Sequence, residues 1–340
     1  IGDWLVDGVT LSPNTDPVTL AEGYNWKVGV LAEGSPENPW KVGAAQPEDV
    51  QAYTNGNGGL VITGEGAIGG RPWLGDDVKG TITEVDIGSG VMVSAADFTG
   101  LDALAKIVVP HGQGEAVKAA LGAPLAALVE ELPNYFAFTG VEYGGMVRLN
   151  GAGICEDPQL ETAFDAMGPW TPLVIDDSMS DDIDLTPGQT VYFRRRNPTP
   201  VTNLNTADYR WKFEIEGQLE ASGNIMSLLD QTCQQTTVGE HAFEGLFSEA
   251  YGLMSAPEMP ATTLAESCYQ SIFYGCTSLT NAPALPAKTL AKWSYTSMFM
   301  GCTSLVRAPE LSATNLSSIQ CCGTMFVDAG NLNAVTVEFG

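Results

Sequence analysis

The sequence of 340 residues predicts a protein of mixed α/β and all-β structure, in which a repeat solenoid is joined to a β-sandwich domain. Two observations lead to this fold class. From residue 233 to the end, one pattern returns every 26 residues, and a fixed period of this length is typical of stacked repeat units. From residue 134 to 232, short apolar runs alternate with turns rich in Gly, Pro and Asn, as in the strands of a sandwich.

The period of 26 is set by positions that keep their residue type from unit to unit. These positions hold Phe247, Phe273 and Phe299, then Leu253, Leu279 and Leu305, and the cysteines Cys276 and Cys302. We expect such residues to face the shared interior of the stack. Ala250 takes the place of the cysteine in an earlier unit, so this position is predicted to be a small buried slot rather than half of a disulfide.

Each unit has two halves of different character. In the first half, Cys268 and Ile272 are four residues apart, which predicts the apolar face of a short helix that ends at Gly275. The second half contains Pro283 and is too short for a helix, so it predicts a brief strand. One unit cannot bury its apolar face alone, and we therefore expect neighbouring units to stack with their strands in a narrow parallel sheet.

The two clearest units read CYQSIFYGCTSLTNAPALPAKTL (268–290) and SYTSMFMGCTSLVRAPELSATNL (294–316). They resemble the BspA-like leucine-rich repeats of bacterial surface proteins. The resemblance implies a leucine-rich-repeat solenoid and a non-catalytic function in binding host proteins or other cells. It also implies a location on a bacterial cell surface or, because similar modules occur in phages of gut bacteria, on a phage virion.

The first 133 residues are expected to form two further parts. Residues 1–50 contain short β-rich runs, and we expect a β-rich segment that serves either for attachment or as a cap. Residues 51–133 resemble the first unit of the same leucine-rich family, because an LVITGEGA strand precedes repeat-like spacing. Apolar residues at helical spacing, interrupted by Gly122 and Pro124, predict two short helices over residues 112–132 that cap this unit.

The predicted β-sandwich domain covers residues 134–232, and residues 233–340 form the predicted repeat array. The segment GQLEASGNIMSLLD, which ends at Asp230, resembles the segment that precedes the repeats in the same surface family. This places the boundary between the two domains.

The charge of the chain excludes one class of partner. Acidic residues outnumber Lys and Arg by 41 to 15, which gives a formal net charge of −26. Such a surface repels phosphates, so no nucleic-acid partner is expected. No run of about twenty apolar residues is present, and no membrane span is expected either.

An acidic stretch provides the only candidate for a metal site. The loop DDSMSDD contributes Asp176, Asp177, Asp181 and Asp182, and calcium prefers oxygen ligands of this type. The spacing of an EF-hand is missing, and a solvated acidic loop is the alternative. Calcium is the only cofactor that we consider.

Catalytic groups are few. The chain has two histidines, His111 and His241, and neither lies near a nucleophile motif such as GxSxG. We therefore expect no enzymatic activity. A glycan hydrolase that uses two facing carboxylates is the minor alternative.

Side chains at variable repeat positions are the candidates for binding. Tyr274, Trp293, Met300 and Arg307 occupy such positions, and exposed aromatic side chains on a rigid surface suit the binding of proteins or glycans. We expect an adhesion protein whose partner is a cell-surface protein or glycan, or the capsid or tail of a virion. A virion decoration or fibre protein without a receptor is the alternative, and a homo-oligomer fits either function.

Overall fold

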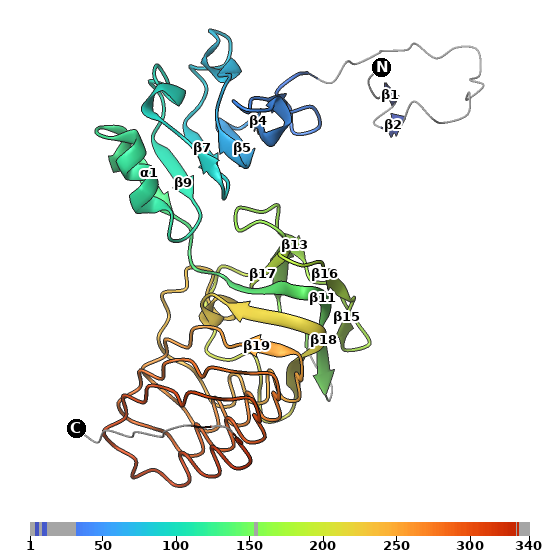
Figure 1. Cartoon of the computed structure of the whole chain (residues 1–340), viewed down its shortest axis with the longest axis vertical. Coiled ribbons are helices and arrows are strands. Elements are labelled where there is room, and N and C mark those ends of the chain that lie inside the picture. Colours follow the sequence, from blue (N-terminus) through green and yellow to red (C-terminus); the bar gives the residue numbers. More distant parts are fainter. Residues whose placement is uncertain (1–3, 7–8, 12–31, 153–155, 331, 333–340) are drawn as a thin grey trace. The chain divides into compact units, whose positions relative to one another are not determined.

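The computed structural model in Figure 1 describes residues 4–6, 9–11, 32–152, 156–330 and 332. The chain divides into two compact units, Ile1–Leu132 and Pro133–Gly340, and each is described by itself. The described residues form mostly β structure, with one α-helix.

Unit 1 is built on a six-stranded sheet with the order β10-β9-β7-β5-β4-β3. Strands β5, β7, β9 and β10 run parallel, and β4 and β3 are added antiparallel at one edge. The bounds are β3 Trp40–Lys41, β4 Val50–Thr54, β5 Gly59–Gly64, β7 Glu84–Ile87, β9 Lys106–Val109 and β10 Val129–Glu131. Two small ribbons pair β1 (Trp4–Val6) with β2 (Val9–Leu11) and β6 (Gly66–Ala67) with β8 (Val91–Met92).

Five short helical segments lie between the strands of this sheet along the chain. They are η1 (Pro47–Asp49), η2 (Pro72–Leu74), η3 (Ala95–Asp97), α1 (Gly114–Leu121) and η4 (Leu125–Leu128). Val117 and Leu121 of α1 join the core formed by Val85 and Ile107 of the sheet. The two short helices predicted over residues 112–132 are α1 and the single 3-10 turn η4, separated at Gly122, whose φ is 63°.

Unit 2 begins with one curled sheet of nine strands. Its longest strands, β11 and β18, pair antiparallel along almost their whole length. The bounds are β11 Phe136–Ala152, β12 Leu160–Ala163, β13 Thr171–Pro172, β14 Ile175–Asp176, β15 Met179–Ser180, β16 Ile183–Leu185, β17 Thr190–Arg195, β18 Arg210–Ser222 and β19 Leu253–Ser255. Glycines let β11 bend, because a Cβ on Gly140 or Gly144 would collide with the backbone of Leu185 and Thr186.

The inner face of this sheet is covered by the first repeat and not by a second sheet. The rings of Phe136 and Phe213 lie 5.8 and 5.7 Å from that of Phe247, and η5 (Ile225–Leu228) fills the same core. One cluster of buried residues continues from the strands into the repeats. The predicted β-sandwich is therefore wrong.

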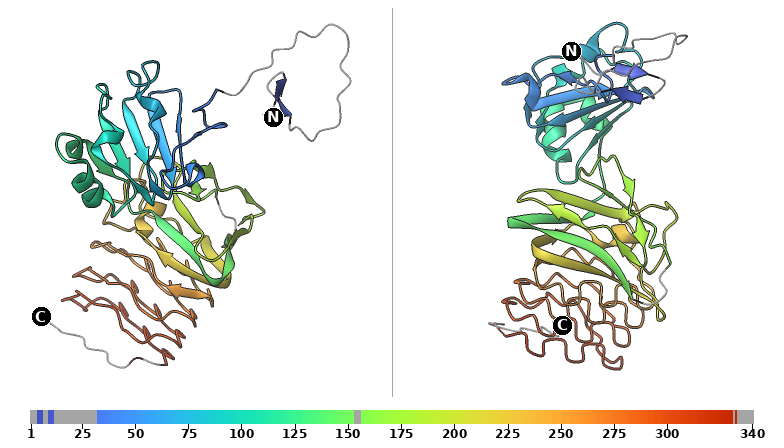
Figure 2. Two further views of the ribbon diagram at one scale, coloured as in Figure 1. Left: turned by 45° about the horizontal axis from the view of Figure 1, so that its top comes forward. Right: turned by 90° about the vertical axis from the view of Figure 1, so that its right-hand side faces the viewer.

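Residues 239–330, which we call the turn stack, contain turns where helices were predicted (Figure 2). Its four turn segments are residues 239–250, 265–276, 291–302 and 318–329. Every fourth residue of each segment has a positive φ, which a right-handed helix does not allow. These residues are His241, Gly245 and Glu249, then Ser267, Ser271 and Gly275, then Trp293, Ser297 and Gly301, and finally Gln320, Thr324 and Asp328.

The backbone hydrogen bonds of the turn segments follow a strict alternation. In the first segment, the amides of Glu244, Leu246 and Ser248 donate to the carbonyl three residues earlier in the same segment. The amides between them donate to the next segment, for example Phe247 to the carbonyl of Ile272 at 2.9 Å. The following two segments repeat this pattern, so half of the amides close turns and half join neighbouring units.

The interior of the turn stack consists of columns of equivalent side chains. Phe247, Phe273, Phe299 and Phe326 stack with ring centroids 5.5, 5.5 and 5.8 Å apart and interplanar angles of 5–8°. In the second halves, the strand β19 and isolated parallel bridges such as Leu285 with Leu311 keep the same register. The predicted fold class, a leucine-rich-repeat solenoid of helices and strands, is therefore wrong, because the four-residue spacing encodes turns.

The first turn segment is closed by the sheet and by one buried asparagine. Asn205 is fully buried and its Nδ2 donates to the carbonyls of Trp211 at 3.0 Å and Glu244 at 2.9 Å. Its Oδ1 accepts from the amide of Trp211 at 2.7 Å. The amide of Phe213 in β18 donates to Leu246 in the same segment. Carbonyls at the start of the stack thus receive donors from outside the repeats.

Ser271→Gly should leave stability unchanged or raise it by up to about 1 kcal/mol, because glycine adopts a positive φ without strain. Ser248 belongs to the same kind of segment but is not a positive-φ position, so Ser248→Gly should cost about 0.5–1 kcal/mol. Urea unfolding of both variants measures the difference. In a helix both substitutions would cost about the same, and that result would contradict the turn assignment.

Asn205→Ala should destabilise unit 2 by about 3 kcal/mol, because it leaves buried backbone groups of Trp211 and Glu244 without partners. Asn281→Ala is the matched control: Asn281 is exposed and its amide reaches only the hydroxyl of Thr280. Equilibrium unfolding should show a change within about 0.5 kcal/mol for the control. Equal midpoints for the two variants would disprove the capping role.

Candidate functional site

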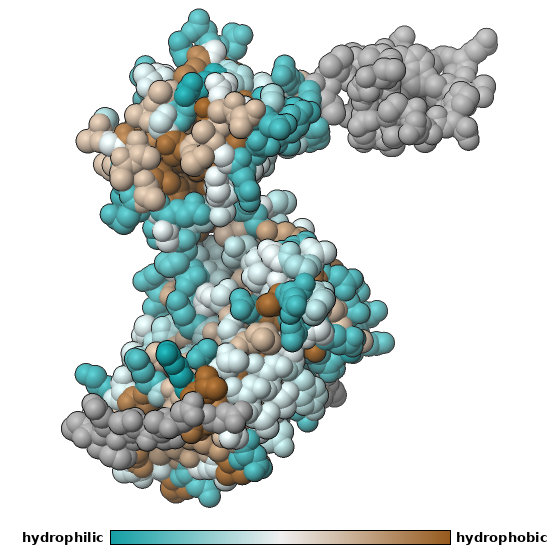
Figure 3. Space-filling view, viewed as in Figure 1, coloured by the Kyte–Doolittle hydropathy of each residue, from teal (hydrophilic) through white to brown (hydrophobic). Residues whose placement is uncertain are grey.

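The turn stack presents its outward side chains in columns. In the turn segments, the positive-φ residue and the residue before it mostly face outward, with the buried Ser267 as an exception, while the two residues after it are mostly buried. Because the segments are in register, equivalent outward residues of successive units lie next to each other. We call these positions the outer columns. In Figure 3, the part of the stack that is visible carries separate hydrophobic residues among weakly polar ones.

One outer column is apolar and contains two of the predicted binding residues. Tyr274 and Met300 are equivalent, and the amides that follow each of them join the same ladder: Gly275 donates to the carbonyl of Met300 at 2.8 Å. Val327 continues the column, and Gly301 donates to its carbonyl at 2.9 Å. Tyr274 and Val327 are 37% and 41% exposed. Three large side chains thus form a continuous apolar column, with Ser248 at its start.

The structure places the other two predicted binding residues elsewhere. Trp293 lies in a different outer column, and its Nε1 donates to Oε1 of Gln320 at 2.9 Å. The Nζ of Lys292 lies 3.7 Å from the centre of the indole ring and also pairs with Glu266 at 2.9 Å. The indole is therefore engaged by its own neighbours. Arg307 is exposed in a second half, where it is bridged to Asn281.

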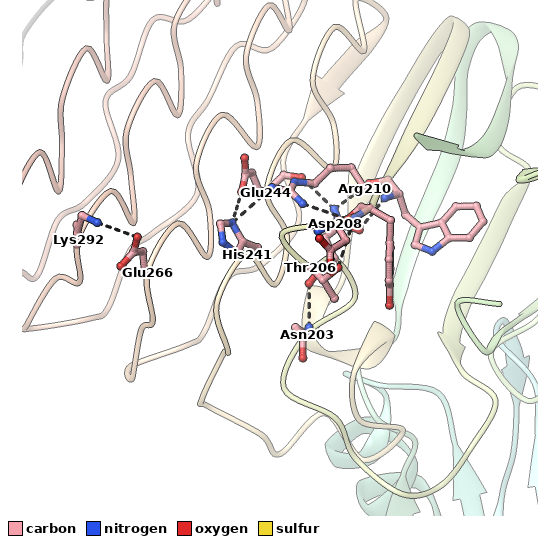
Figure 4. A network of polar contacts seen from close by, with 11 residues as sticks. Asn203, Thr206, Asp208, Arg210, His241, Glu244, Glu266 and Lys292 are labelled. Atoms are coloured by element: carbon pink, nitrogen blue, oxygen red, sulfur yellow. Dashed lines mark hydrogen bonds and ion pairs between the residues drawn. The ribbon is translucent and has the colours of Figure 1, made fainter. Parts of the chain in front are cut away.

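A network of charged residues lies where β18 meets the turn stack (Figure 4). Arg210 contacts Glu244 at 2.9 Å, and the same carboxylate oxygen accepts a bond from His241. Sequence reasoning missed this network, because its members come from a strand and from the first turn segment. The place of His241 in the four-residue spacing was visible in the sequence, but its proximity to Arg210 was not.

A groove of about 290 Å³ adjoins this network. It is lined by Asn150, Gly151, Ala152, Arg210, Lys212, Glu214, Glu244, Gly245 and Ser271. Burial alone would raise the pKa of Glu214, but hydrogen bonds from Asn150 and Arg148 and the Arg148 charge outweigh it and hold this pKa below its usual value. A carboxylate held ionised in this way is suited to binding and not to donating a proton.

A second depression lies between second halves of the first two units and has a similar volume, about 290 Å³. Most of its lining is apolar: Ala256, Pro257, Met259, Pro260, Pro283, Ala284 and Pro286, with Glu258 at its side. The repeated prolines were visible in the sequence. That they share one surface follows only from the register of the stack.

The four aspartates considered for calcium do not come together. Asp176, Asp177, Asp181 and Asp182 are all exposed, and Asp182 is held at 3.4 Å from Arg148. Among the described residues, no group of three or more His, Cys, Asp or Glu side chains is placed to hold a metal ion.

The predicted structural positions of the repeat are buried. Phe247, Phe273 and Phe299, Leu253, Leu279 and Leu305, and Cys276 and Cys302 each have no exposed surface. The thiols of Cys276 and Cys302 donate to the carbonyls of Phe247 and Phe273 at 3.0 and 3.1 Å, and burial raises the pKa of Cys302 to about 12. The six cysteines within the described ranges are all free thiols, and Cys155 lies outside those ranges.

The comparisons with known proteins give no match. No protein-family model matches the chain, and no similar curated protein or solved structure was found. Within the described residues, no helix has the length and apolar character needed to cross a membrane.

Unit 1 carries one carboxyl group with a strongly shifted pKa. Asp86 lies on β7, in register with Val61 of β5 on one side and Val108 of β9 on the other. Burial raises the pKa of Asp86 to about 6, the charge of Glu84 adds to this, and Lys106 partly opposes it. The ionised form is therefore disfavoured in the folded unit.

The stability of unit 1 should fall as the pH rises from about 4 to about 6. The pKa of Asp86 is raised on folding, so its protonated form favours the folded state below the unfolded pKa, and this contribution is lost as pH rises through about 6. Asp86→Asn should remove the dependence and stabilise unit 1 at pH 7 by about 1–2 kcal/mol, allowing for partial exposure. Unfolding between pH 4 and 7 measures this, with the exposed Asp102→Asn as control. Parallel pH profiles for wild type and Asp86→Asn would refute it.

Proposed function

We propose that this protein is a non-catalytic recognition protein that binds a cell-surface protein or glycan through the outer columns of its turn stack. We further propose that it acts on an exterior surface, of a bacterial cell or of a phage particle. The sequence of its repeats, which resembles the repeat sequence of BspA-like surface proteins, supports this location.

The observation that carries the proposal is the contrast between inward and outward positions within this one chain. The inward column retains phenylalanine in all four segments, from Phe247 to Phe326. The outward column next to it reads Ser248, Tyr274, Met300 and Val327. A scaffold whose interior is constant and whose exposed column varies in size and chemistry is suited to recognition.

The turn stack also holds the backbone that carries these side chains in a fixed register. The hydrogen-bonded ladder joins each turn segment to the next, so neighbouring outward side chains are spaced by about 4.8 Å, the usual distance between paired backbones. Little side-chain or backbone freedom is then lost on binding, which favours affinity. Tyr and Met are residue types that are enriched at interfaces.

The charged groups that line the groove beside the network are paired with other charged side chains, which supports a binding function over a hydrolytic one. Glu214 is bound by Arg148 at 2.8 Å, and Glu244 by Arg210 at 2.9 Å. A hydrolase needs one carboxyl group that stays protonated near neutral pH. At Glu214, the hydrogen bonds from Asn150 and Arg148 and the charge of Arg148 lower the pKa and favour the opposite protonation state.

Binding should depend on the apolar column. We expect the labelled full-length protein to bind saturably to a printed array of bacterial and mammalian glycans or to mucin-coated wells. Tyr274→Ser combined with Met300→Ser should weaken this binding at least tenfold, because it removes the two largest side chains of the column. The melting temperature should change little, since both side chains are partly exposed.

Val306→Ser is the matched control, because Val306 is also an exposed apolar residue of the stack, 40% exposed, but lies in a second half. Its binding should equal that of the wild type. If the wild type binds neither surface, or if the double variant binds as well as the wild type, recognition through this column is refuted. A structural decoration or fibre protein would give the first of these results.

A further inference from the structure

The last described turn segment carries a row of backbone N–H groups that have no hydrogen-bond partner among the residues that the structure describes. These are the amides of Gln320, Cys322, Thr324, Phe326 and Asp328, which we call the donor edge. Their equivalents in the third segment all donate to the fourth, for example Tyr295 to the carbonyl of Cys321 at 2.8 Å. The five amides themselves donate to nothing within the residues that the structure describes.

The donor edge presents donors without acceptors. The carbonyls of Ile319, Cys321, Gly323, Met325 and Val327 already accept bonds from the third segment. The carbonyls of Gln320, Cys322, Thr324 and Phe326 accept turn bonds inside the fourth segment. Both sets of carbonyls therefore already accept hydrogen bonds. The amides that point away from the third segment give this end a row of aligned partial positive charges.

The aromatic column is also open at this end. The ring of Phe326 stacks on Phe299 at 5.8 Å and 6°, as every earlier pair in the column does. Unlike the three preceding phenylalanines, which are fully buried, Phe326 is only partly buried. The end of the stack thus offers five donors and one ring, arranged as in the three interfaces before it.

We infer that the donor edge docks a segment of a partner polypeptide that folds into the same four-residue turns. The partner supplies five alternate backbone carbonyls to the five amides and an aromatic side chain to the ring of Phe326. The three interfaces between turn segments show this mode of contact directly, since each joins the same row of amides to alternate carbonyls of the next segment.

An extended strand does not fit this edge. Each residue of a strand that turns its carbonyl toward a neighbour turns its own N–H to the same side. Half of its groups would therefore oppose the N–H groups of the donor edge. A segment in the turn conformation of the stack presents carbonyls alone on one side, and so matches all five positions.

A second copy of this chain does not fit either. Its complementary carbonyls belong to the first turn segment, where Ala242, Glu244 and Leu246 already accept from Leu204 and Asn205, from the Asn205 side chain, and from Phe213. Two donor edges facing each other would bring like partial charges together. The donor edge therefore fits a repeat-bearing segment whose own first turn segment is not capped.

The donor edge is distinct from the outer columns, so this inference and the proposed function can fail separately. The probe is a fluorescein-labelled peptide with the sequence of residues 265–290, in which both cysteines are replaced by alanine. This segment supplies the carbonyls of Glu266 to Tyr274 to the first segment in the native stack. Full-length protein is titrated into the peptide and the anisotropy is measured, with a scrambled peptide as reference.

We expect saturable 1:1 binding to wild-type protein and at least tenfold weaker binding to Cys322→Pro, which removes one donor and adds a ring at the edge. Cys322→Ala keeps the amide and should bind as the wild type does. If Cys322→Pro fails to fold, amide exchange of the wild type decides: the peptide should slow exchange at the five donor-edge amides and leave that of Gly323 unchanged. Absence of saturable binding, equal binding to Cys322→Pro, or self-association of the wild type through this edge would overturn the inference.

Discussion

The alternation of backbone hydrogen bonds in the turn stack is the constraint on which the rest of unit 2 depends. Because every fourth residue, such as Ser271 or Ser297, has a positive φ, the chain turns at each of these positions and sends alternate amides toward the next unit. The same geometry turns two residues of every four inward, so Phe273 and Ile272 are buried while Tyr274 is exposed. Backbone, core and candidate surface therefore follow from one local conformation.

The stack needs a template at its start, and the curled sheet provides it. The first turn segment completes the core of the sheet through Phe247, and Asn205 and β18 occupy its free carbonyls. The two ends of the stack are consequently different: one is capped by donors from the same chain, and the other presents donors of its own. This polarity arises because every backbone hydrogen bond between turn segments runs from an amide to a carbonyl of the following unit.

Part of this arrangement could be predicted from the sequence. The period of 26 identified the buried positions, including Leu279 and Cys302, and it placed Tyr274 and Met300 in equivalent positions. The helix could not be distinguished from the turns, because apolar residues four apart fit both and the sign of φ at Ser or Trp leaves no mark on the sequence. Strands with alternating apolar residues also do not show what packs against them. The sequence therefore predicted a second sheet, whereas the repeats complete the core. The pairing of Trp293 with Gln320 was hidden by one extra residue between the last two units.

The most direct test of the central claim is a measurement of backbone φ angles by nuclear magnetic resonance over residues 240–302 of the full-length protein. We expect positive φ at His241, Glu249, Ser267, Ser271, Trp293 and Ser297, and negative φ at the non-glycine residues between them. An unbroken run of negative, helical φ angles over residues 265–276 would contradict the turn stack, and with it both the outer columns and the donor edge.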